Sequence, residues 1–276
     1  MKTLLIAGFG DIARRAAPQL ARSFVLAPLS RRHGADLDRP ETLSAFAAAD
    51  AVLHCAPPPA RGTADPRTAN LLASLEKAGI LPARFVYVST SGVYGDCGGE
   101  RVDESRPICP QTDRARRRAD AEAQLARWCG ARAIPLLTLR VPGIYAEDRL
   151  PLERLRAGTP VLRAEDDVYT NHVHAADLAA IVVRALEDDA PPGVYNASDD
   201  TELRAGDWMD LVADRCGLPR PPRIAQSEAA TRLPAETRSF LGESRRLVNR
   251  RLKEQLGIRL RYPTVADGLP RARAAA

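Results

Sequence analysis

The sequence GFGDIA at residues 8–13, which directly follows an apolar run, constrains the fold of this chain more than any other segment. The run Thr3–Ala7 predicts a buried strand, and the stretch after the glycines predicts a helix. At such a turn Gly8 permits a tight bend, Gly10 lets the backbone approach a phosphate, and the small Ala13 lets the helix pack on the strand. Because free N–H groups at a helix start bind a pyrophosphate, the segment predicts a dinucleotide site. The residues predicted to contact the coenzyme here are Gly8, Gly10, Asp11 and Ile12.

The first half of the chain alternates short apolar runs with longer helical stretches. Continuous apolar runs bounded by turn residues are typical of strands that are buried on both faces. This alternation predicts the α/β class, with a doubly wound parallel sheet covered by helices on both faces. The expected strands are Thr3–Ala7, Phe24–Pro28, Ala51–Cys55, Phe85–Ser89 and Ile134–Arg140, and the expected helices lie near 11–22, 41–49, 66–79 and 112–130.

The pattern changes after Tyr145. Helices are expected at 151–157 and 175–187, and a short strand around Val194 returns the chain to the sheet. From residue 200 onward the sequence favours helices, is rich in arginine and is broken by prolines, which indicates a small cap domain. We therefore expect a dinucleotide-binding domain of residues 1–145 with 172–197, and a substrate or cap domain of residues 146–171 with 198–276.

Composition narrows the function classes. Apolar residues make up 45% of the 276 residues, and no run reaches the ~18 apolar residues of a membrane helix, so we expect a cytoplasmic protein without a membrane partner. The net charge is +5, but the basic residues are not interleaved with aromatic residues, which argues against nucleic-acid binding. Five scattered cysteines without a CxxC pair predict neither disulfides nor a metal site. A small-molecule substrate is expected, and the sequence does not choose between a monomer and a homodimer.

The end of the second expected strand predicts which coenzyme is bound. An Asp or Glu there would bind the ribose 2′-hydroxyl of NAD, whereas this chain has Ser30, Arg31 and Arg32. A hydroxyl followed by two guanidiniums suits a phosphate dianion, because arginine binds phosphate bidentately. NADP(H) is therefore preferred over NAD(H), the alternative being solvated surface arginines. Asp36 is a candidate to bind the adenine amine or to cap a turn, while Asp11 would repel a nearby pyrophosphate.

Three further segments, in this order, resemble the extended short-chain dehydrogenase/reductases of the NAD-dependent epimerase/dehydratase type. They are STSGVYG at 89–95, LRVPGIY at 139–145 and HAADLA at 174–179. The resemblance implies a Rossmann-like fold, a nicotinamide dinucleotide, and a substrate cleft against a small C-terminal cap domain. It also implies that Ala56 and Pro57, after the third strand, lie beside the coenzyme. Thr90 would bind the reacting oxygen, and the alternative for Thr90 is a hydroxyl that satisfies the local backbone.

The family's catalytic tyrosine and lysine, spaced as YxxxK, are absent from this sequence. If Glu122 stands where the family commonly has an acidic residue, Arg118 takes the lysine position and Arg114 the tyrosine position. An arginine keeps its proton at every working pH, so Arg114 can bind an oxyanion but cannot act as an acid or base. Arg118 would bind ribose hydroxyls in place of the lysine. The alternative is a solvated helix in which these arginines pair with Asp120 and Glu122.

Four other side chains are candidates for contact with the substrate, namely Ser91, Tyr94, Tyr145 and His172. Core packing is the favoured role for both tyrosines, whereas His172 lies outside the family pattern and would titrate near neutrality. These observations predict an NADP(H)-dependent oxidoreductase or epimerase that acts on a small sugar, polyol or carbonyl compound. The arginines would suit a substrate that carries negative charge. The alternative is a non-catalytic NADP(H)-binding redox sensor or partner-binding protein.

Overall fold

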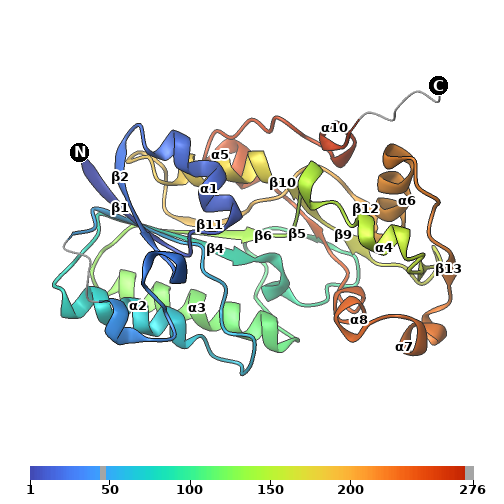
Figure 1. The fold of residues 1–276 in the computed structure, drawn as a ribbon, viewed down its shortest axis with the longest axis horizontal. Coiled ribbons are helices and arrows are strands. Elements are labelled where there is room, and N and C mark those ends of the chain that lie inside the picture. Colours follow the sequence, from blue (N-terminus) through green and yellow to red (C-terminus); the bar gives the residue numbers. More distant parts are fainter. Residues whose placement is uncertain (44–47, 271–276) are drawn as a thin grey trace.

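The chain folds around one parallel sheet with the strand order β11-β6-β4-β3-β1-β2 (Figure 1). The structure is a computed structural model that describes residues 1–43 and 48–270. Every neighbouring pair of strands in this sheet is parallel, which confirms the expected fold class. The strands are β1 Lys2–Ala7, β2 Phe24–Leu29, β3 Ala51–His54, β4 Arg84–Thr90, β6 Leu136–Val141 and β11 Gly193–Asn196.

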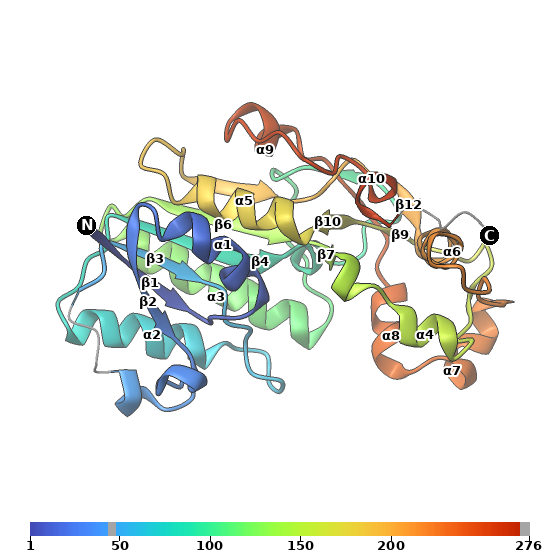
Figure 2. The same ribbon diagram turned by 45° about the horizontal axis from the view of Figure 1, so that its top comes forward.

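Helices cover both faces of the sheet, and each face has its own apolar core (Figures 1 and 2). On one face lie α1 (Asp11–Leu20) and α5 (Ala175–Ala185), and on the other lie α2 (Pro66–Lys77) and α3 (Asp113–Gly130). Side chains of β1 alternate between these faces, with Leu4 in the first core and Leu5 in the second. A strand that is buried twice must be apolar throughout, which is why the runs in the sequence are continuous.

The direction in which strands are added reverses at β1. Its neighbours are β2 on one side and β3 on the other, and α1 begins directly beyond its carboxyl end. In open parallel sheets, ligands bind in the crevice that such a reversal leaves outside the carboxyl ends of the strands. The glycine segment therefore lies where the sheet itself leaves room for a ligand.

One expected helix differs from the structure. The prediction of a helix at 41–49 falls partly on residues 44–47, which lie outside the described residues, and Pro40–Leu43 form a 3₁₀ turn. The chain therefore passes from β2 to β3 through short turns over the part that the structure describes. The helix expected at 151–157 is present as α4 (Leu152–Arg156).

Smaller elements gather beyond the carboxyl ends of β4 and β6 (Figure 2). They form two-stranded sheets that pair β7 with β10, β9 with β12, β8 with β13 and β5 with β14. These strands are β5 Arg101–Val102, β7 Gly143–Tyr145, β8 Val161–Leu162, β9 Tyr169–Thr170, β10 His172–His174, β12 Leu203–Arg204, β13 Arg223–Ile224 and β14 Arg246–Leu247. The remaining helices are α6 Ala205–Cys216, α7 Ala229–Arg232, α8 Ala235–Leu241, α9 Arg250–Glu254 and α10 Val265–Gly268.

Candidate coenzyme and substrate site

The backbone at Gly8 has a conformation that only glycine adopts without strain. Its φ is +88°, and a Cβ atom added there would lie 2.4 Å from the backbone nitrogen of Ala56. Gly8 donates its N–H to Leu29 O at 2.9 Å, so the loop after β1 is fixed to the end of β2 and pressed against the segment after β3. The first turn of α1 follows directly, which leaves its N–H groups at the crevice.

A cavity of about 380 Å³ lies beside this loop, at the carboxyl ends of β1, β2 and β3. It brings together most of the residues that the sequence predicts for the coenzyme: Gly8, Gly10, Ser30, Arg31, Arg32, Asp36, Ala56 and Pro57. Ile12 is an exception, because its side chain is buried in the apolar core under α1. Any contact of Ile12 with a coenzyme must therefore be made by its backbone.

Arginines that make no ion pair with the described residues line this cavity, which we name the coenzyme cavity. The side chains of Arg31 and Arg32 are exposed, and neither makes an ion pair or hydrogen bond with a residue that the structure describes. The side chain of Arg14, in α1, also lines the cavity and likewise has no such partner within the described ranges. Arg14 was not predicted from the sequence, although it follows the glycine segment on the helix side opposite the buried Ala13 and Ala16.

Asp11, which sequence analysis flagged as repelling a pyrophosphate, is held by two arginines. Arg15 Nε donates to its Oδ1 at 2.9 Å, and Arg149 Nη1 lies 2.9 Å from its Oδ2. Arg15 also pairs with Asp148 at 2.5 Å, so four charged side chains connect α1 to the turn Glu147–Arg149. Asp11 is not among the residues that line the coenzyme cavity. Its negative charge is offset, which reduces its repulsion of a bound phosphate.

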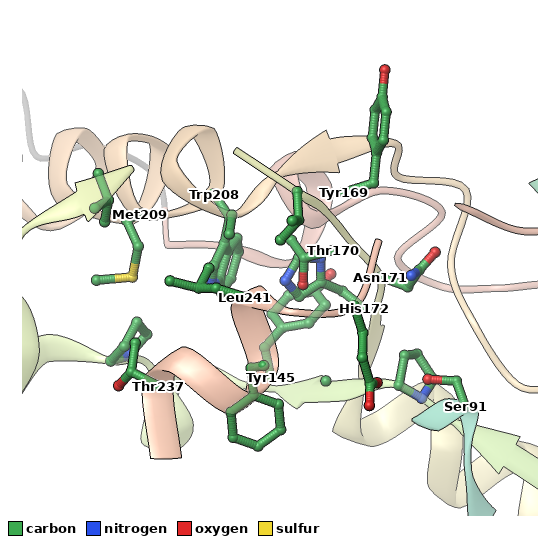
Figure 3. A pocket seen from close by; sticks show the side chains of 18 of the residues that line it. Ser91, Tyr145, Tyr169, Thr170, Asn171, His172, Trp208, Met209, Thr237 and Leu241 are labelled. Carbon is green, nitrogen blue, oxygen red and sulfur yellow. The ribbon is translucent and has the colours of Figure 1, made fainter. Parts of the chain in front are cut away.

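A second, larger cavity of about 550 Å³ opens between the carboxyl ends of β4 and β6 and the C-terminal elements (Figure 3). Of the predicted site residues it contains Thr90, Ser91, Arg114, Tyr145 and His172. Thr90 Oγ1 accepts a hydrogen bond from Gly92 N at 3.2 Å. The Thr90 hydroxyl therefore does satisfy the local backbone, which was the alternative role predicted for it. Thr90 also lines the cavity.

The two arginines at the YxxxK positions lie in different environments. Arg114 places its guanidinium over the ring of Phe240, 3.9 Å from the ring centre, at the cavity. Arg118 is half-buried and donates to Tyr87 Oη at 3.2 Å and to the Val88 carbonyl at 3.0 Å. Burial raises the pKa of Tyr87 to about 12, so this hydroxyl stays protonated. Arg118 therefore lies against the end of β4 and Arg114 faces the larger cavity.

The alternative of a solvated helix with surface ion pairs is wrong for Glu122. This carboxylate is buried, accepts a hydrogen bond from Ser89 Oγ at 2.5 Å, and pairs with Arg140 at 2.8 Å. Asp120 accepts hydrogen bonds from Asp65 N and Gln124 rather than from an arginine. The inner face of α3 is thus fixed to β4 and β6 by buried polar contacts, which hold Arg114 and Arg118 in place.

Two predicted substrate residues have roles in packing. Tyr94 is fully buried, lies outside both cavities, and donates its hydroxyl to Asn196 Oδ1 at 2.8 Å, so its position does not support contact with a substrate. Tyr145 lines the larger cavity with its ring but donates its hydroxyl to Thr264 O at 3.2 Å. Burial raises the pKa of Tyr145, which keeps this proton in place. Core packing, the favoured role for both rings, is what the structure has.

His172 lies in the wall of the larger cavity, beside a residue that the sequence analysis missed. Its ring packs against Trp208 of α6, with 4.4 Å between ring centres, and the two rings lie together with Tyr145 in Figure 3. Burial lowers the pKa of His172 to about 3, so the imidazole is neutral and does not titrate near neutrality as expected. Only the folded chain brings α6 to this wall, and no local motif marks Trp208.

Two further findings concern metals and membranes. Within residues 1–43 and 48–270, no group of three or more His, Cys, Asp or Glu side chains is arranged to hold a metal ion. Over the same part of the chain, none of the helices combines the length and apolar character that crossing a membrane requires.

The chain belongs to the NAD dependent epimerase/dehydratase family, whose model matches residues 11–198. A 3-diazoavenalumate denitrifying reductase from Streptomyces sp is 29% identical over 214 residues, which are 74% of this chain and 69% of that protein. The match to the family covers all of α1 and the residues around Thr90 and Arg114.

The fold is shared with many solved structures, of which two are described here. A conserved protein of unknown function from Silicibacter pomeroyi DSS superimposes with a TM-score of 0.77 at 29% identity, over 97% of this chain and 96% of that one. UDP-glucose 4-epimerase from Thermus thermophilus, in complex with NAD, gives a TM-score of 0.74 at 21% identity, over 99% of this chain and 97% of that one. At that identity the second likeness is evidence for the fold alone.

Proposed function

We propose that this protein is an NADP(H)-dependent reductase or epimerase that transfers hydride to or from a small anionic molecule. The observation that carries the proposal is the pair of cavities at one edge of the sheet. The coenzyme cavity contains the side chains of Arg31 and Arg32 without ion-pair partners among the described residues, and the larger cavity begins at Thr90 and Arg114. The name of the Streptomyces relative, a reductase, supports reduction over epimerisation.

The residues of the coenzyme cavity fit NADP(H). Because Gly8 has no side chain, its loop lies against the backbone of Ala56. A Cβ added at Gly10 would meet no atom within 4 Å, and this open space leaves room for a pyrophosphate at the start of α1. Arg31 and Arg32 would hold the 2′-phosphate by charge-assisted hydrogen bonds, and Asp36 would face the adenine. When bound, the nicotinamide ring supplies or accepts the hydride. NAD(H) is the weaker ligand in this proposal, because it leaves both guanidiniums without an anion.

The larger cavity would bind the reacting group through cations and hydroxyls. Thr90 would donate a hydrogen bond to the substrate oxygen, and Arg114 would stabilise negative charge on it. Arg118 would act from the coenzyme side, since its guanidinium has further donors beyond the two that bind β4. Neither arginine exchanges a proton, so the proton needed after hydride transfer comes from solvent in this proposal.

The test is NADPH oxidation with a panel of small carbonyl compounds that carry a carboxylate, compared with the same compounds as esters. Thr90→Val and Arg114→Met are expected to lower kcat/KM by about 10- to 1,000-fold, the range for loss of one oxyanion donor. Arg116→Met is the matched control, because Arg116 lies on the same helix but is exposed and pairs with Asp113. Unchanged turnover in both test variants would reject the assigned site.

A second candidate is a non-catalytic NADP(H)-binding protein. It is favoured by Arg114 at the position where the family has its tyrosine, since no proton donor replaces the tyrosine there. This candidate predicts that NADPH binds as tightly as in the first and that no member of the panel is reduced. Turnover above the rate of the Thr90→Val protein would exclude it.

A further inference from the structure

We propose that the substrate of the larger cavity is a planar aromatic carboxylate rather than a sugar nucleotide. The inference rests on the proposed function and names the substrate class for the same site. It follows from the aromatic and cationic side chains of the cavity wall and from the bonds that its carboxylates and amide make within the fold.

One wall of the cavity is a fixed aromatic surface. Trp208 packs its ring against His172, and it meets Tyr145 edge-on with 5.5 Å between ring centres. Tyr145 in turn is anchored by its hydroxyl bond to Thr264 O. Because these rings hold one another in place, the wall presents a preorganised surface on which a flat apolar ring loses little entropy when it binds. Met209 and Leu241 extend the same apolar wall (Figure 3).

The carboxylates and the amide at this cavity are committed to the protein. Asn171 donates to Arg245 O and accepts from Leu247 N, and Asp167 accepts from Val168 N and Gly206 N. These are the groups that a sugar ring needs as partners for its hydroxyls, because a bound hydroxyl without a partner costs binding energy. Each amide or carboxylate named here already has its bonds inside the fold.

Two other polar side chains of the wall, Glu243 and His172, are also bonded or enclosed within the fold. Glu243 pairs with Arg245 at 2.9 Å through one oxygen, and its other oxygen is enclosed by the fold without access to solvent. His172 Nδ1 is enclosed in the same way. His172 therefore contributes its carbon surface to the cavity, and Glu243 serves to neutralise Arg245. Among the described residues that line the cavity, the carboxylates and the amide are thus all bonded or enclosed within the fold.

A cationic platform also lines the cavity. The ring of Phe240 is 54% exposed, and the guanidinium of Arg114 lies over it at 3.9 Å. A guanidinium that stacks by its face donates hydrogen bonds within its own plane, the geometry in which arginine binds a carboxylate bidentately. Arg154 also lines the cavity, and its guanidinium makes no ion pair or hydrogen bond with the described residues. An exposed aromatic ring under one guanidinium, with a second guanidinium in the wall of the same cavity, suits a ring that carries an anion.

The test measures ligand binding by calorimetry in the presence of saturating NADP⁺, with three probes. trans-Cinnamate is expected to bind, cinnamyl alcohol, which lacks the carboxylate, to bind at least about 10-fold more weakly, and UDP-glucose to show no binding at millimolar concentration. Arg114→Met, Arg154→Met and Trp208→Leu are each expected to weaken cinnamate by about 5- to 50-fold. Arg116→Met is expected to leave the affinity within about twofold and serves as the control.

Two results overturn this inference: UDP-glucose binds in preference to cinnamate, or neither compound binds. Equal loss of affinity in Arg116→Met and Arg114→Met would also overturn it, because the effect would then be one of general charge. Titration of NADPH in the same protein separates this inference from the proposed function. NADPH binding without cinnamate binding rejects only the aromatic substrate, whereas cinnamate binding without NADPH binding rejects the proposed reaction.

Discussion

The two cavities of this protein differ in how their residues come together. The coenzyme cavity is lined by residues from the first 67 positions of the chain, and most of its wall was visible as motifs in the sequence. The larger cavity takes its wall from segments spread between Thr90 and Arg245. A ligand of fixed structure is matched by a short stretch of backbone, whereas a variable substrate is matched by surfaces that only the complete fold assembles.

Their charges differ as well. In the coenzyme cavity the guanidiniums of Arg14, Arg31 and Arg32 make no ion pair with the described residues. Arg67, which also lines this cavity, is paired with Asp38. In the larger cavity Arg154 makes no ion pair with the described residues, but Arg245 is paired with Glu243 and Arg149 with Asp11. We therefore expect the first cavity to bind the more highly charged ligand, and the second to bind a ligand with less charge and more apolar surface.

The largest effect is expected from Gly8→Ala, which would disrupt coenzyme binding in the coenzyme cavity. The added methyl group meets the Ala56 backbone, and the positive φ adds strain of about 1–3 kcal/mol. NADPH affinity, measured by calorimetry, is expected to fall by more than about 100-fold. Gly62→Ala is the matched control, since Gly62 has φ +82° but no atom within 4 Å of an added Cβ. Similar NADPH affinity in the two variants would show that the close approach at Gly8 is unimportant.

The next effect tests whether the arginines in the coenzyme cavity choose the coenzyme. Arg31→Met and Arg32→Met are each expected to weaken NADPH by about 10- to 100-fold, the value of a charge-assisted hydrogen bond, and to leave NADH within about twofold. Arg22→Met changes an exposed arginine away from the cavity and provides the control. Parallel losses for NADPH and NADH would mean that these guanidiniums do not contact the 2′-phosphate.

A pH-dependent effect is expected from Asp199, which lies behind the wall of the larger cavity and donates its backbone N–H to His172 O at 2.8 Å. Burial raises the pKa of this carboxyl to about 7. The folded protein then holds a proton that the unfolded chain releases near pH 4, so this group's contribution to stability falls as pH rises from about 4 to 7. Asp199→Asn is therefore expected to stabilise the fold by about 1–3 kcal/mol at pH 8 and by little at pH 4.

Urea unfolding at both pH values measures this effect. The low pKa of His172 acts in the opposite direction, because a histidine buried in its neutral form loses stability as pH falls below about 6.5. The difference between wild type and Asp199→Asn cancels the His172 contribution. An equal change in unfolding free energy at pH 4 and pH 8 would contradict the assignment.

The smallest effect tests whether the two cavities are independent. Asp11 belongs to the glycine segment and Arg149 lines the larger cavity, and they are joined by an ion pair. Asp11→Asn is expected to tighten NADPH binding about two- to fivefold, and Arg149→Met to weaken it by a similar factor, at low salt. In the double variant the two effects should not add, because each acts through the pair. Strict additivity would show that the cavities do not communicate through these charges.

The sheet could be predicted from the sequence because a strand that is buried on both faces is a continuous apolar run. β1 and β3 are apolar over most of their length, and the expected strands match the observed ones to within two residues at each end. The convergence of Gly8, Arg31 and Ala56 followed from the rule that carboxyl ends of parallel strands share one edge. The roles assigned to these residues stay predictions.

The substrate wall could not be predicted in the same way. Trp208 belongs to α6 and Phe240 to α8, and nothing near either residue in the chain specifies its contact with His172 or Arg114. Tyr94 was named as a candidate because it stands in a motif, and its hydroxyl is instead used by Asn196, 102 residues away. Long-range packing decides such positions, and a single sequence contains no direct record of it.

The return of β11 to the sheet limits where this chain can be truncated. β11 pairs along β6, yet it follows α4 and α5 in the chain, after strands that contribute to the larger cavity. A fragment that stopped at residue 145 would leave one side of β6 with unpaired backbone groups, the kind of exposed edge that recruits other chains into aggregates. Truncation for biophysical work should therefore keep residues 193–196, and isotope labelling of the intact chain is the safer route to studying either half.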